Sequence, residues 1–528
     1  MQSRIFLNAA LVITVGMLPA CDSPKRSETS FARPNVILFL VDDLGFTDHS
    51  LEPTGSRIYE TPNLERLRAE GMLFTNAYAA HPNCSPTRAS ILTGKYPARL
   101  GLTWTVGNDK PWLTEDVPAV TEPGIGTPSK WNHFAKTLQA ESRRFLPLSE
   151  FTIAEAMQDL QKPYTTAFIG KWHLGDDRHS PRHQGFKHVG TVVGAGPARA
   201  GGHFIPALRP VDRMIASDFA QRKERTLEWT NEAVEFLRRQ RDAEQPFMLF
   251  LWHFDVHGPW QARSDRVLYY RNKIARNAID ENQSANGHTN PVYASMVERV
   301  DRSLGMILDL LDSDEFAEMK KNTVVIFTSD NGAATRKLGS RPGEPLFKIT
   351  SNHPLRGHKH SIHEGGIRVP AVVRWPEVVP GGSTCDVPVT TVDFYPTFLE
   401  LAGQAGDTDW REQVLDGVSL VPLLKGEQSL NRDAIFFHTP HYIQARDPNT
   451  GELWMRPASS VRQGDWKLIR WYGEGDALYN LRNDIGETRD LADERADVTA
   501  RLSTMLDGWL NETGAVIPTP NPQYTGPH

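Results

Sequence analysis

The sequence predicts an α/β fold, with one large, mostly parallel β-sheet flanked by helices and a smaller C-terminal antiparallel sheet with a helix. Short apolar runs of strand length alternate with segments of helical periodicity, which is typical of a sheet lying between two layers of helices. Several of these runs end abruptly in polar or ionisable residues. With 528 residues and 39% hydrophobic content, the chain is long enough to bury a large core.

Four of the apolar runs have the length of strands buried on both faces. They comprise residues 36–41, 165–169, 247–252 and 324–328. The polar clusters that follow them are, in the same order, Asp42 with Asp43, Lys171 with His173, His253 with Asp255 and His257, and Asp330 with Asn331. The helical patterns between the runs cover residues 62–70, 151–160, 225–239 and 293–311. Because ligands bind beyond the carboxyl ends of parallel strands, we expect the polar clusters to converge on one site.

Two segments depart from this alternation. Residues 104–147 are rich in Pro, Gly and Trp with little periodicity, and we interpret them as an insertion over the site. Beyond residue 426, the short runs 466–471 and 477–481 predict antiparallel strands, and a helix is predicted over 496–510. The C-terminal part of the chain is therefore expected to form a sheet of its own.

The N-terminus has the pattern of an export signal, with one early basic residue and an apolar stretch too short to span a bilayer comfortably. The Leu-Pro-Ala-Cys sequence ending at Cys21 resembles the lipobox of bacterial lipoproteins, so we expect a signal peptide over residues 1–20 and a lipid anchor on Cys21. An ordinary cleaved signal, with no role for Cys21, is the alternative. The expected location is periplasmic or at the cell surface of a Gram-negative bacterium, with the anchor as the only membrane attachment. We expect a flexible tether over residues 21–33, a main domain over 34–425 and a C-terminal subdomain over 426–528.

Bulk charge and cysteine content exclude two classes of protein. The formal net charge of −6 gives no basic excess, so no nucleic-acid partner is expected. The cysteines are Cys21, Cys84 and Cys385, which are too few for a disulfide framework in an exported chain of this size. If Cys21 carries lipid and Cys84 is chemically modified, Cys385 remains as a buried thiol. A Cys84–Cys385 disulfide is the alternative.

Asp42, Asp43, Asp330 and Asn331 place carboxylates and an amide oxygen at two predicted strand ends. So much negative charge in one place is unfavourable unless a cation neutralises it. Hard oxygen ligands without Cys or paired His favour Ca²⁺ or Mg²⁺ over zinc. Each pair alone is more often a turn or a helix cap, but two pairs at matched strand ends predict one metal site.

The segment from Cys84 to Gly94 predicts a short helix with Cys84 at its N-terminus. Ser85 suits the N-cap, Pro86 the first helical position and Gly94 the C-terminal stop. Backbone N–H groups at a helix N-terminus favour an anion, and Arg88 lies one turn along. We therefore expect an anion site around Cys84.

The run Cys-Ser-Pro-Thr-Arg at residues 84–88, followed by Leu-Thr-Gly, resembles the signature of formylglycine-dependent sulfatases, a family with the alkaline-phosphatase-like fold. The resemblance covers about residues 34–491, includes a second signature at 355–370, and is strongest to bacterial polysaccharide and N-acetylgalactosamine-type sulfatases. By family pattern the metal ligands are Asp42, Asp43, Asp330, Asn331 and modified Cys84. By the same pattern the residues acting with Cys84 in catalysis are Arg88, Lys171, His173, His257 and Lys359. The resemblance implies that the substrate contacts Lys171, His257 and Lys359, and we expect a further contact from His360.

This resemblance also implies a mechanism and partners. A formylglycine-generating or anaerobic sulfatase-maturating enzyme would convert Cys84 to formylglycine, and Ca²⁺ is the expected metal. A hydroxyl of the hydrated aldehyde would attack sulfur while His257 protonates the departing sugar oxygen. His173 would then remove the proton of the second hydroxyl and so expel sulfate, while Lys171 and Lys359 neutralise the sulfate oxygens.

The resemblance favours a sulfate ester on galactose or N-acetylgalactosamine in an algal or host polysaccharide, with a preference for a 4-sulfate. One alternative is a phosphonate monoester or phosphodiester hydrolase of the same superfamily, and another is a non-catalytic lipoprotein that binds sulfated glycans. His358 and His360 flank Lys359 where family members often carry small residues, so they are candidates to touch the sugar. For His358, His360, His363 and His203, taken singly, a structural role is the favoured interpretation.

Overall fold

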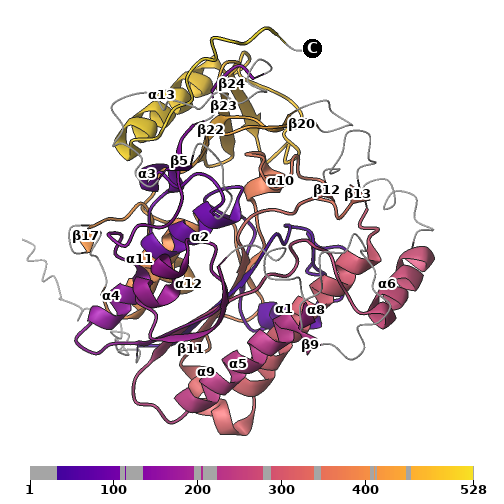
Figure 1. Ribbon diagram of the computed structural model, residues 1–528, viewed down its shortest axis with the longest axis vertical. Helices are drawn as coiled ribbons and strands as arrows, with labels where there is room; N and C mark the ends of the chain where they lie inside the picture. The colour runs from indigo at the N-terminus through magenta and orange to yellow at the C-terminus, as the bar shows by residue number, and fades with distance from the viewer. Residues whose placement is uncertain are drawn as a thin grey trace, which may run out of the picture. The chain divides into compact units, whose positions relative to one another are not determined.

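The computed structural model (Figure 1) describes residues 33–106, 113–114, 135–138, 140–194, 204–205, 223–277, 287–337, 347–404, 409–410, 413–446 and 453–526. Residues 33–528 form one compact unit. The expected signal peptide, the anchor at Cys21, almost all of the tether and much of the 104–147 insertion lie outside the described residues. Within the described ranges, no helix combines the length and the apolar character needed to cross a membrane.

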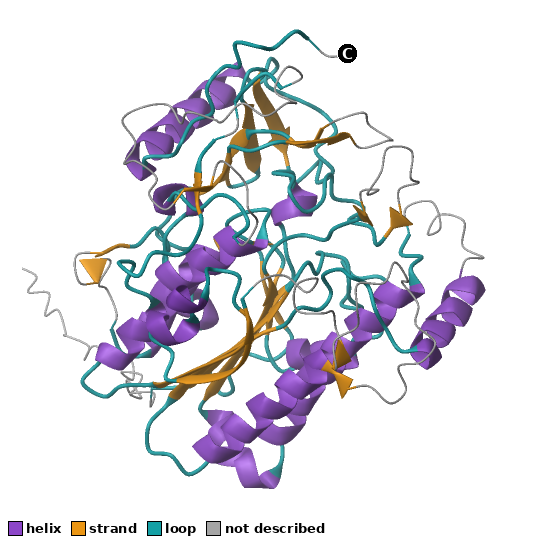
Figure 2. Ribbon diagram, viewed as in Figure 1, coloured by secondary structure: helices purple, strands orange, loops and turns teal. Residues whose placement is uncertain are grey.

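A central sheet of eight strands carries the fold (Figure 2). Its order is β15 (Ser383–Cys385), β2 (Met72–Phe74), β14 (Ala371–Arg374), β11 (Thr323–Ser329), β1 (Asn35–Val41), β10 (Phe247–Trp252), β6 (Thr165–Lys171) and β7 (His188–Val193). From β11 to β7 neighbouring strands are parallel, whereas β14 is antiparallel to both β11 and β2. The prediction of a mixed, mostly parallel sheet is confirmed.

The predicted strands correspond to β1, β6, β10 and β11. The predicted helices correspond to α1 (Pro62–Ala69), α4 (Ile153–Asp159), α5 (Arg225–Gln240) and α8 (Pro291–Leu311). Helix α4 begins at Ile153 rather than at residue 151 because Thr152 and Glu155 form a capping box, in which each side chain accepts a hydrogen bond from the other residue's backbone N–H. Helix α8 begins at Pro291 because the side chain of Asn290 caps it.

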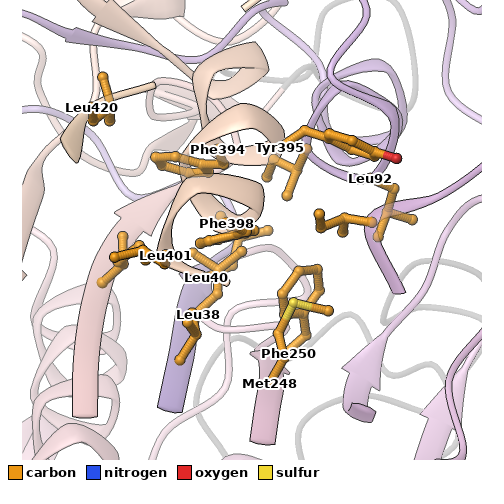
Figure 3. Close-up of a cluster of buried hydrophobic side chains, with 14 of the residues drawn as sticks. Leu38, Leu40, Leu92, Met248, Phe250, Phe394, Tyr395, Phe398, Leu401 and Leu420 are labelled. Carbon is orange, nitrogen blue, oxygen red and sulfur yellow. The ribbon is translucent and has the colours of Figure 1, made fainter. Parts of the chain in front are cut away.

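Helices cover both faces of the sheet (Figure 1). Successive side chains of β1 point alternately into two separate hydrophobic cores, one on each face. Leu38 and Leu40 pack with Phe250 against Phe394 and Phe398 of α11 (Phe394–Leu401), as Figure 3 shows. The same core includes α2 (Cys84–Thr93), α4 and α12 (Val421–Leu424). Ile37, Phe39 and Val41 of β1 face a second core with α1, α5, α6 (Ser264–Asn277) and α8. Apolar burial on both faces explains why the central strands are almost uninterrupted apolar runs.

A second sheet forms the C-terminal part of the chain, as predicted. Its strands are β19 (Ile435–Thr439), β22 (Ala458–Gln463), β23 (Trp466–Trp471) and β24 (Gly475–Asn480), all paired antiparallel. Helix α13 (Ala496–Thr513) packs its buried Leu502 and Leu506 on Leu468 and Leu478 of this sheet. The domain boundary near residue 426 stays a prediction.

Cys385 differs from expectation. Cys84 and Cys385 are both free thiols, so the alternative disulfide is not formed. Cys385 is only half-buried, and the expectation of a buried thiol is wrong. The reason is its place at the end of β15, which is an edge strand covered on one side only by β2.

A buried ion-pair cluster ties the C-terminal sheet to α10 (Glu364–Ile367). Lys467 of β23 is fully buried, and its Nζ lies 2.9 Å from Oε1 of Glu364 and 2.9 Å from Oε1 of Glu487. The other carboxylate oxygen of Glu487 accepts a hydrogen bond of 2.7 Å from the backbone N–H of Glu364. Lys467 therefore neutralises two carboxylates that have no access to solvent.

Replacing Lys467 by Met should destabilise the protein strongly, because the two buried carboxylates lose the cation that they share. We expect the free energy of unfolding, measured by urea denaturation, to fall by about 3–5 kcal/mol. The matched control is Arg482→Met, which removes a cation from an exposed pair with Asp465 and should leave the urea midpoint unchanged. Equal midpoints for the two variants would contradict this account of the cluster.

Candidate active site

The polar clusters predicted at the strand ends do converge on one edge of the central sheet. The parallel register pairs Val41 with Ser329 and Trp252 with Gly170, so the residues that follow these strands emerge side by side. Beyond the strand ends, the backbone N–H of Asp42 donates to the carbonyl of Asp255 at 2.9 Å, and that of Asp330 donates to Val41 at 3.1 Å. The ladder thus continues into the polar residues and fixes their spacing.

The candidate metal ligands include two groups of three residues, both containing Asp42, that are each compact enough to hold a cation. Ligand atoms of Asp42, Cys84 and Asp330 all lie within 4.8 Å of one another, and so do those of Asp42, Asp43 and His257. Oxygen ligands bind Ca²⁺ at about 2.3–2.6 Å, so ligands on opposite sides of one ion are separated by about 5 Å. Oδ1 of Asp42 and Oδ1 of Asn331 are buried without a hydrogen-bond partner. Such oxygens fit a hard cation, because a buried acceptor with no partner is otherwise unfavourable.

Each carboxylate of this group also has a permanent cation as a neighbour. The guanidinium of Arg88 donates to Oδ2 of Asp330 through Nε at 2.9 Å and Nη2 at 2.7 Å. Lys171 Nζ pairs with Asp42, and Lys359 Nζ lies 2.6 Å from Oδ1 of Asp43. All of these side chains are buried. The predicted cations and carboxylates therefore form one compact cluster.

Burial and charge shift the pKa values of these groups in opposite directions. Burial raises the pKa of Asp330 to about 6, and the negative charge of Asp42 acts in the same direction. Burial also disfavours ionisation of Asp42, but the surrounding cations, Lys171 first among them, hold its pKa well below the usual range. Burial lowers the pKa of Lys359, and the carboxylate of Asp43 more than reverses this, so Lys359 stays charged. The ionised form of Asp330 is thus less stabilised than that of Asp42, and an additional cation would favour its ionisation.

Cys84 lies at the start of α2, but the helix begins two residues earlier than expected. Asn83 is the N-cap, so the prediction that Ser85 caps the helix is wrong; its hydroxyl instead accepts a hydrogen bond of 3.0 Å from the backbone of Val106. The C-terminal stop is confirmed, since Gly94 adopts φ 67°, a conformation that favours glycine. Every residue of α2 is buried.

The thiol of Cys84 and the ring of His173 are neighbours. Sγ lies 3.3 Å from Nδ1 of His173. Burial raises the pKa of the Cys84 thiol and lowers that of His173 well below its ordinary value. His173 is therefore a neutral imidazole that can accept a proton.

His257 lies beside Asp43. Its Nε2 is 3.7 Å from Oδ2 of Asp43, and its Nδ1 is 2.6 Å from the carbonyl oxygen of Gly258. Burial lowers the pKa of His257 to about 4, and Lys359 acts in the same direction. A bound anion would act in the opposite direction.

Close backbone contact brings Lys359 to the strand ends. Gly332 follows Asn331, and a Cβ at this position would lie 2.0 Å from the carbonyl oxygen of Gly365, so only glycine allows the approach. The backbone N–H of Lys359 then donates to Ala333 at 2.9 Å. The second signature is thus packed directly on the end of β11.

The histidines around Lys359 have different neighbours, and His360 contacts Trp104 and Pro82. Its ring stacks on Trp104, with centroids 6.4 Å apart, and its backbone N–H donates to Pro82 at 2.9 Å. His363 instead lies 3.3 Å from Glu487 in the buried ion-pair cluster, which favours the structural alternative for this residue. Nδ1 of His358 is 2.6 Å from the carbonyl oxygen of Lys359. Trp104 belongs to the segment that the sequence marked as an insertion, and its place next to His360 had no signal in the sequence.

Comparison with known proteins gives one consistent result. The family described as Sulfatase matches residues 34–404, and the family described as N-sulphoglucosamine sulphohydrolase, C-terminal, matches residues 357–512. A sulfatase of Formosa agariphila is 28% identical, over 96% of this chain and 94% of its own. The N-acetylgalactosamine-6-sulfatase of Mus musculus is 33% identical, over 78% of this chain and 70% of its own.

A solved structure agrees with these sequence matches. The crystal structure of Ps i-CgsB in complex with k-i-k-neocarrahexaose superposes with a TM-score of 0.65 and 25% identity, and the match covers 94% of this chain and 95% of that one. Because the Sulfatase family matches most of the chain, the protein belongs to this family, the type I sulfatases of the alkaline-phosphatase-like superfamily, and is a sulfuric ester hydrolase.

Proposed function

We propose that the protein removes sulfate from galactose or N-acetylgalactosamine units of an algal or host polysaccharide, using formylglycine at position 84 and Ca²⁺. The observation that carries this proposal is the contact of Cys84 with a buried cluster of three carboxylates and three permanent cations. These charges balance before any metal binds. A divalent cation would leave the site net positive, which suits a singly charged sulfate ester.

The donor set supports Ca²⁺ as the metal. Asp42, Asp43, Asp330 and Asn331 offer hard oxygen ligands, and two of these oxygens are buried without another partner. When bound, the ion would neutralise negative charge that develops on the sulfate group. The chain's own cations, Lys171 and Lys359, would act beside it on the sulfate oxygens.

The histidines have separate proposed roles. Formylglycine supplies, in its hydrated form, the hydroxyl nucleophile that a thiol does not provide. His173, neutral and next to position 84, accepts a proton from that side chain. His257, beyond Asp43, donates a proton to the sugar oxygen as it leaves. His360, which follows Lys359 and stacks on Trp104, is the residue that we propose to contact the sugar.

A carbohydrate substrate is supported by what the similar proteins are named for. One is an N-acetylgalactosamine-6-sulfatase, and another was crystallised with a neocarrahexaose. Membership of the sulfatase family favours sulfate esters over the phosphonate and phosphodiester alternative. It also favours an enzyme over a non-catalytic glycan-binding protein.

Two further parts of the proposal concern the export and the maturation of the chain. We propose that residues 1–20 direct export and that Cys21 then carries a lipid anchor, on the pattern Leu-Pro-Ala-Cys.

We also propose that a maturating enzyme modifies Cys84 before the chain folds. Cys84 is 1% exposed and the whole of α2 is buried, so an enzyme that reads the segment 84–88 needs it unfolded.

The substrate proposal is tested by sulfate release from a panel of defined esters. The panel contains the 4- and 6-sulfates of galactose and N-acetylgalactosamine, a sulfated galactan oligosaccharide, a phosphonate monoester and a phosphodiester. We expect a galactose-type sulfate to be the best substrate, with turnover falling about 10³-fold or more in Cys84→Ala. Faster turnover of the phosphorus esters would favour the first alternative. Glycan binding without turnover, unchanged in Cys84→Ala, would favour the second.

The order of modification and folding gives a separate prediction. Folded, unmodified protein should stay unmodified when it is mixed with a maturating enzyme, whereas a peptide spanning residues 80–94 should be converted. The measurement is the mass of the peptide that contains residue 84. Conversion of the folded protein as fast as the peptide would show that α2 opens readily and that burial does not set the order.

The metal proposal predicts a change in stability that does not depend on activity. Adding Ca²⁺ to chelator-treated protein should raise its unfolding temperature, because the ion binds only the folded state; a hundredfold excess over the dissociation constant is worth about 2.7 kcal/mol. Asp43→Asn should abolish most of this shift. The control Asp176→Asn, which alters an exposed carboxylate, should keep it. An unchanged shift in Asp43→Asn, or a shift with Mg²⁺ as large as that with Ca²⁺, would argue against the proposed site or its metal.

A further inference from the structure

We infer that Arg299 is a positioning residue that sets the orientation of His257. The inference rests on the proposed function, in which His257 protonates the departing sugar oxygen. Arg299 belongs to the middle of α8 and is 2% exposed. No sequence motif contains it.

Arg299 holds both ends of the segment that carries His257. Its Nε and Nη2 donate to the two carboxylate oxygens of Asp255 at 2.7 Å and 2.6 Å. Both of its Nη atoms lie 3.2 Å from the carbonyl oxygen of Gln261, and Nη1 also donates to Glu224 at 3.1 Å. These bonds equal in number the five N–H groups of a guanidinium. Asp255, two residues before His257, and Gln261, four residues after it, are thus fixed to the same side chain.

The opposite side of the segment is fixed to the strand end that bears the metal ligands. The backbone of Asp42 donates to the carbonyl of Asp255 at 2.9 Å and accepts from Val256 at 2.7 Å. Within the segment, the backbone N–H of His257 turns back to Phe254 at 2.9 Å. His257 therefore projects from a turn that is held between β1 and α8. The position of its ring relative to Asp43 therefore depends on the hydrogen bonds that Arg299 makes to the ends of this turn.

The guanidinium is suited to this task in a way that an ammonium is not. Its planar fork meets the Asp255 carboxylate with two parallel bonds and still reaches Gln261. In Arg299→Lys the positive charge stays beside the buried Asp255, so the carboxylate keeps a cation. The fork and the contact with Gln261 are lost. The variant therefore changes geometry more than it changes charge.

The inference is tested by how the rate depends on the leaving group. A sugar alkoxide needs protonation as it leaves, whereas 4-nitrophenolate leaves well without it. In Arg299→Lys holoenzyme we expect kcat/KM to fall about 10- to 100-fold on the sugar sulfate, within the 10²–10⁴-fold worth of general acid catalysis. On 4-nitrophenyl sulfate we expect a fall of less than about threefold. A purely structural role would lower both rates equally, by reducing the fraction of folded enzyme.

Four further variants complete the design, one of which is His257→Ala alone. Arg302→Lys is the matched control, since Arg302 lies one turn along α8, is half-exposed and also faces Glu224; it should change neither rate. Asp255→Asn weakens the same pair of hydrogen bonds from the partner side. It should also lower kcat/KM more on the sugar sulfate than on 4-nitrophenyl sulfate, and it replaces Arg299→Lys if that variant does not fold. Arg299→Lys added to His257→Ala should cause no further loss on the sugar sulfate, because the two residues act through one group.

The outcomes separate this inference from the proposed function. If kcat/KM falls more on the sugar sulfate than on 4-nitrophenyl sulfate in His257→Ala, but not in Arg299→Lys or Asp255→Asn, the inference is overturned and the acid role of His257 stands. If His257→Ala lowers kcat/KM equally on both substrates, the acid role of His257 is overturned, and the inference is overturned with it. Equal losses on both substrates in Arg299→Lys and Asp255→Asn also overturn the inference.

Discussion

The site depends on one constraint: three carboxylates and three permanent cations are packed together out of contact with water. Each charge alone would be strongly unfavourable at such a position, and each is tolerated because an opposite charge lies beside it. Removing any one of them leaves a neighbour uncompensated. The cluster is therefore fixed as a unit, and the strand ends that carry it must keep their spacing.

The scaffold meets that requirement through the parallel strands of the central sheet. Both faces of β1 are buried under helices, so its end has little freedom, and backbone bonds continue the ladder into Asp42 and Asp330. Immediately beyond the strands the backbone is strained, with φ of 63° at Asp43 and 58° at His173. Such conformations cost about 1–3 kcal/mol each in a residue other than glycine, and they persist only where the surroundings enforce them. They turn the two side chains into the site directly after each strand.

Much of this could be predicted from the sequence because the signals are local. Apolar runs of strand length, and the polar residues that end them, predicted the sheet and brought Asp42, Asp330, Lys171 and His257 to one edge. What failed or was missing depends on contacts distant in sequence. The start of α2 is displaced because Ser85 bonds to Val106 instead of capping the helix, and Cys385 is half-buried because β15 has an edge. Arg299 has partners 38, 44 and 75 residues away, and no periodicity or motif marks such a side chain.

The two segments that bring polar side chains to the strand ends from outside the sheet are held in the same way. Arg299 of α8 binds the segment that carries His257 through the buried carboxylate of Asp255. Lys467 of the C-terminal sheet binds the segment after Lys359 through buried carboxylates as well. Well-packed apolar residues of similar volume would often give equal or greater stability than such ion pairs. Apolar contacts are not directional, however, whereas a bidentate bond or a lysine between two carboxylates allows only one arrangement. Orientation rather than stability therefore explains why charged groups occupy both positions. It also explains why a C-terminal sheet that supplies none of the candidate ligands is built into the same compact unit as the site.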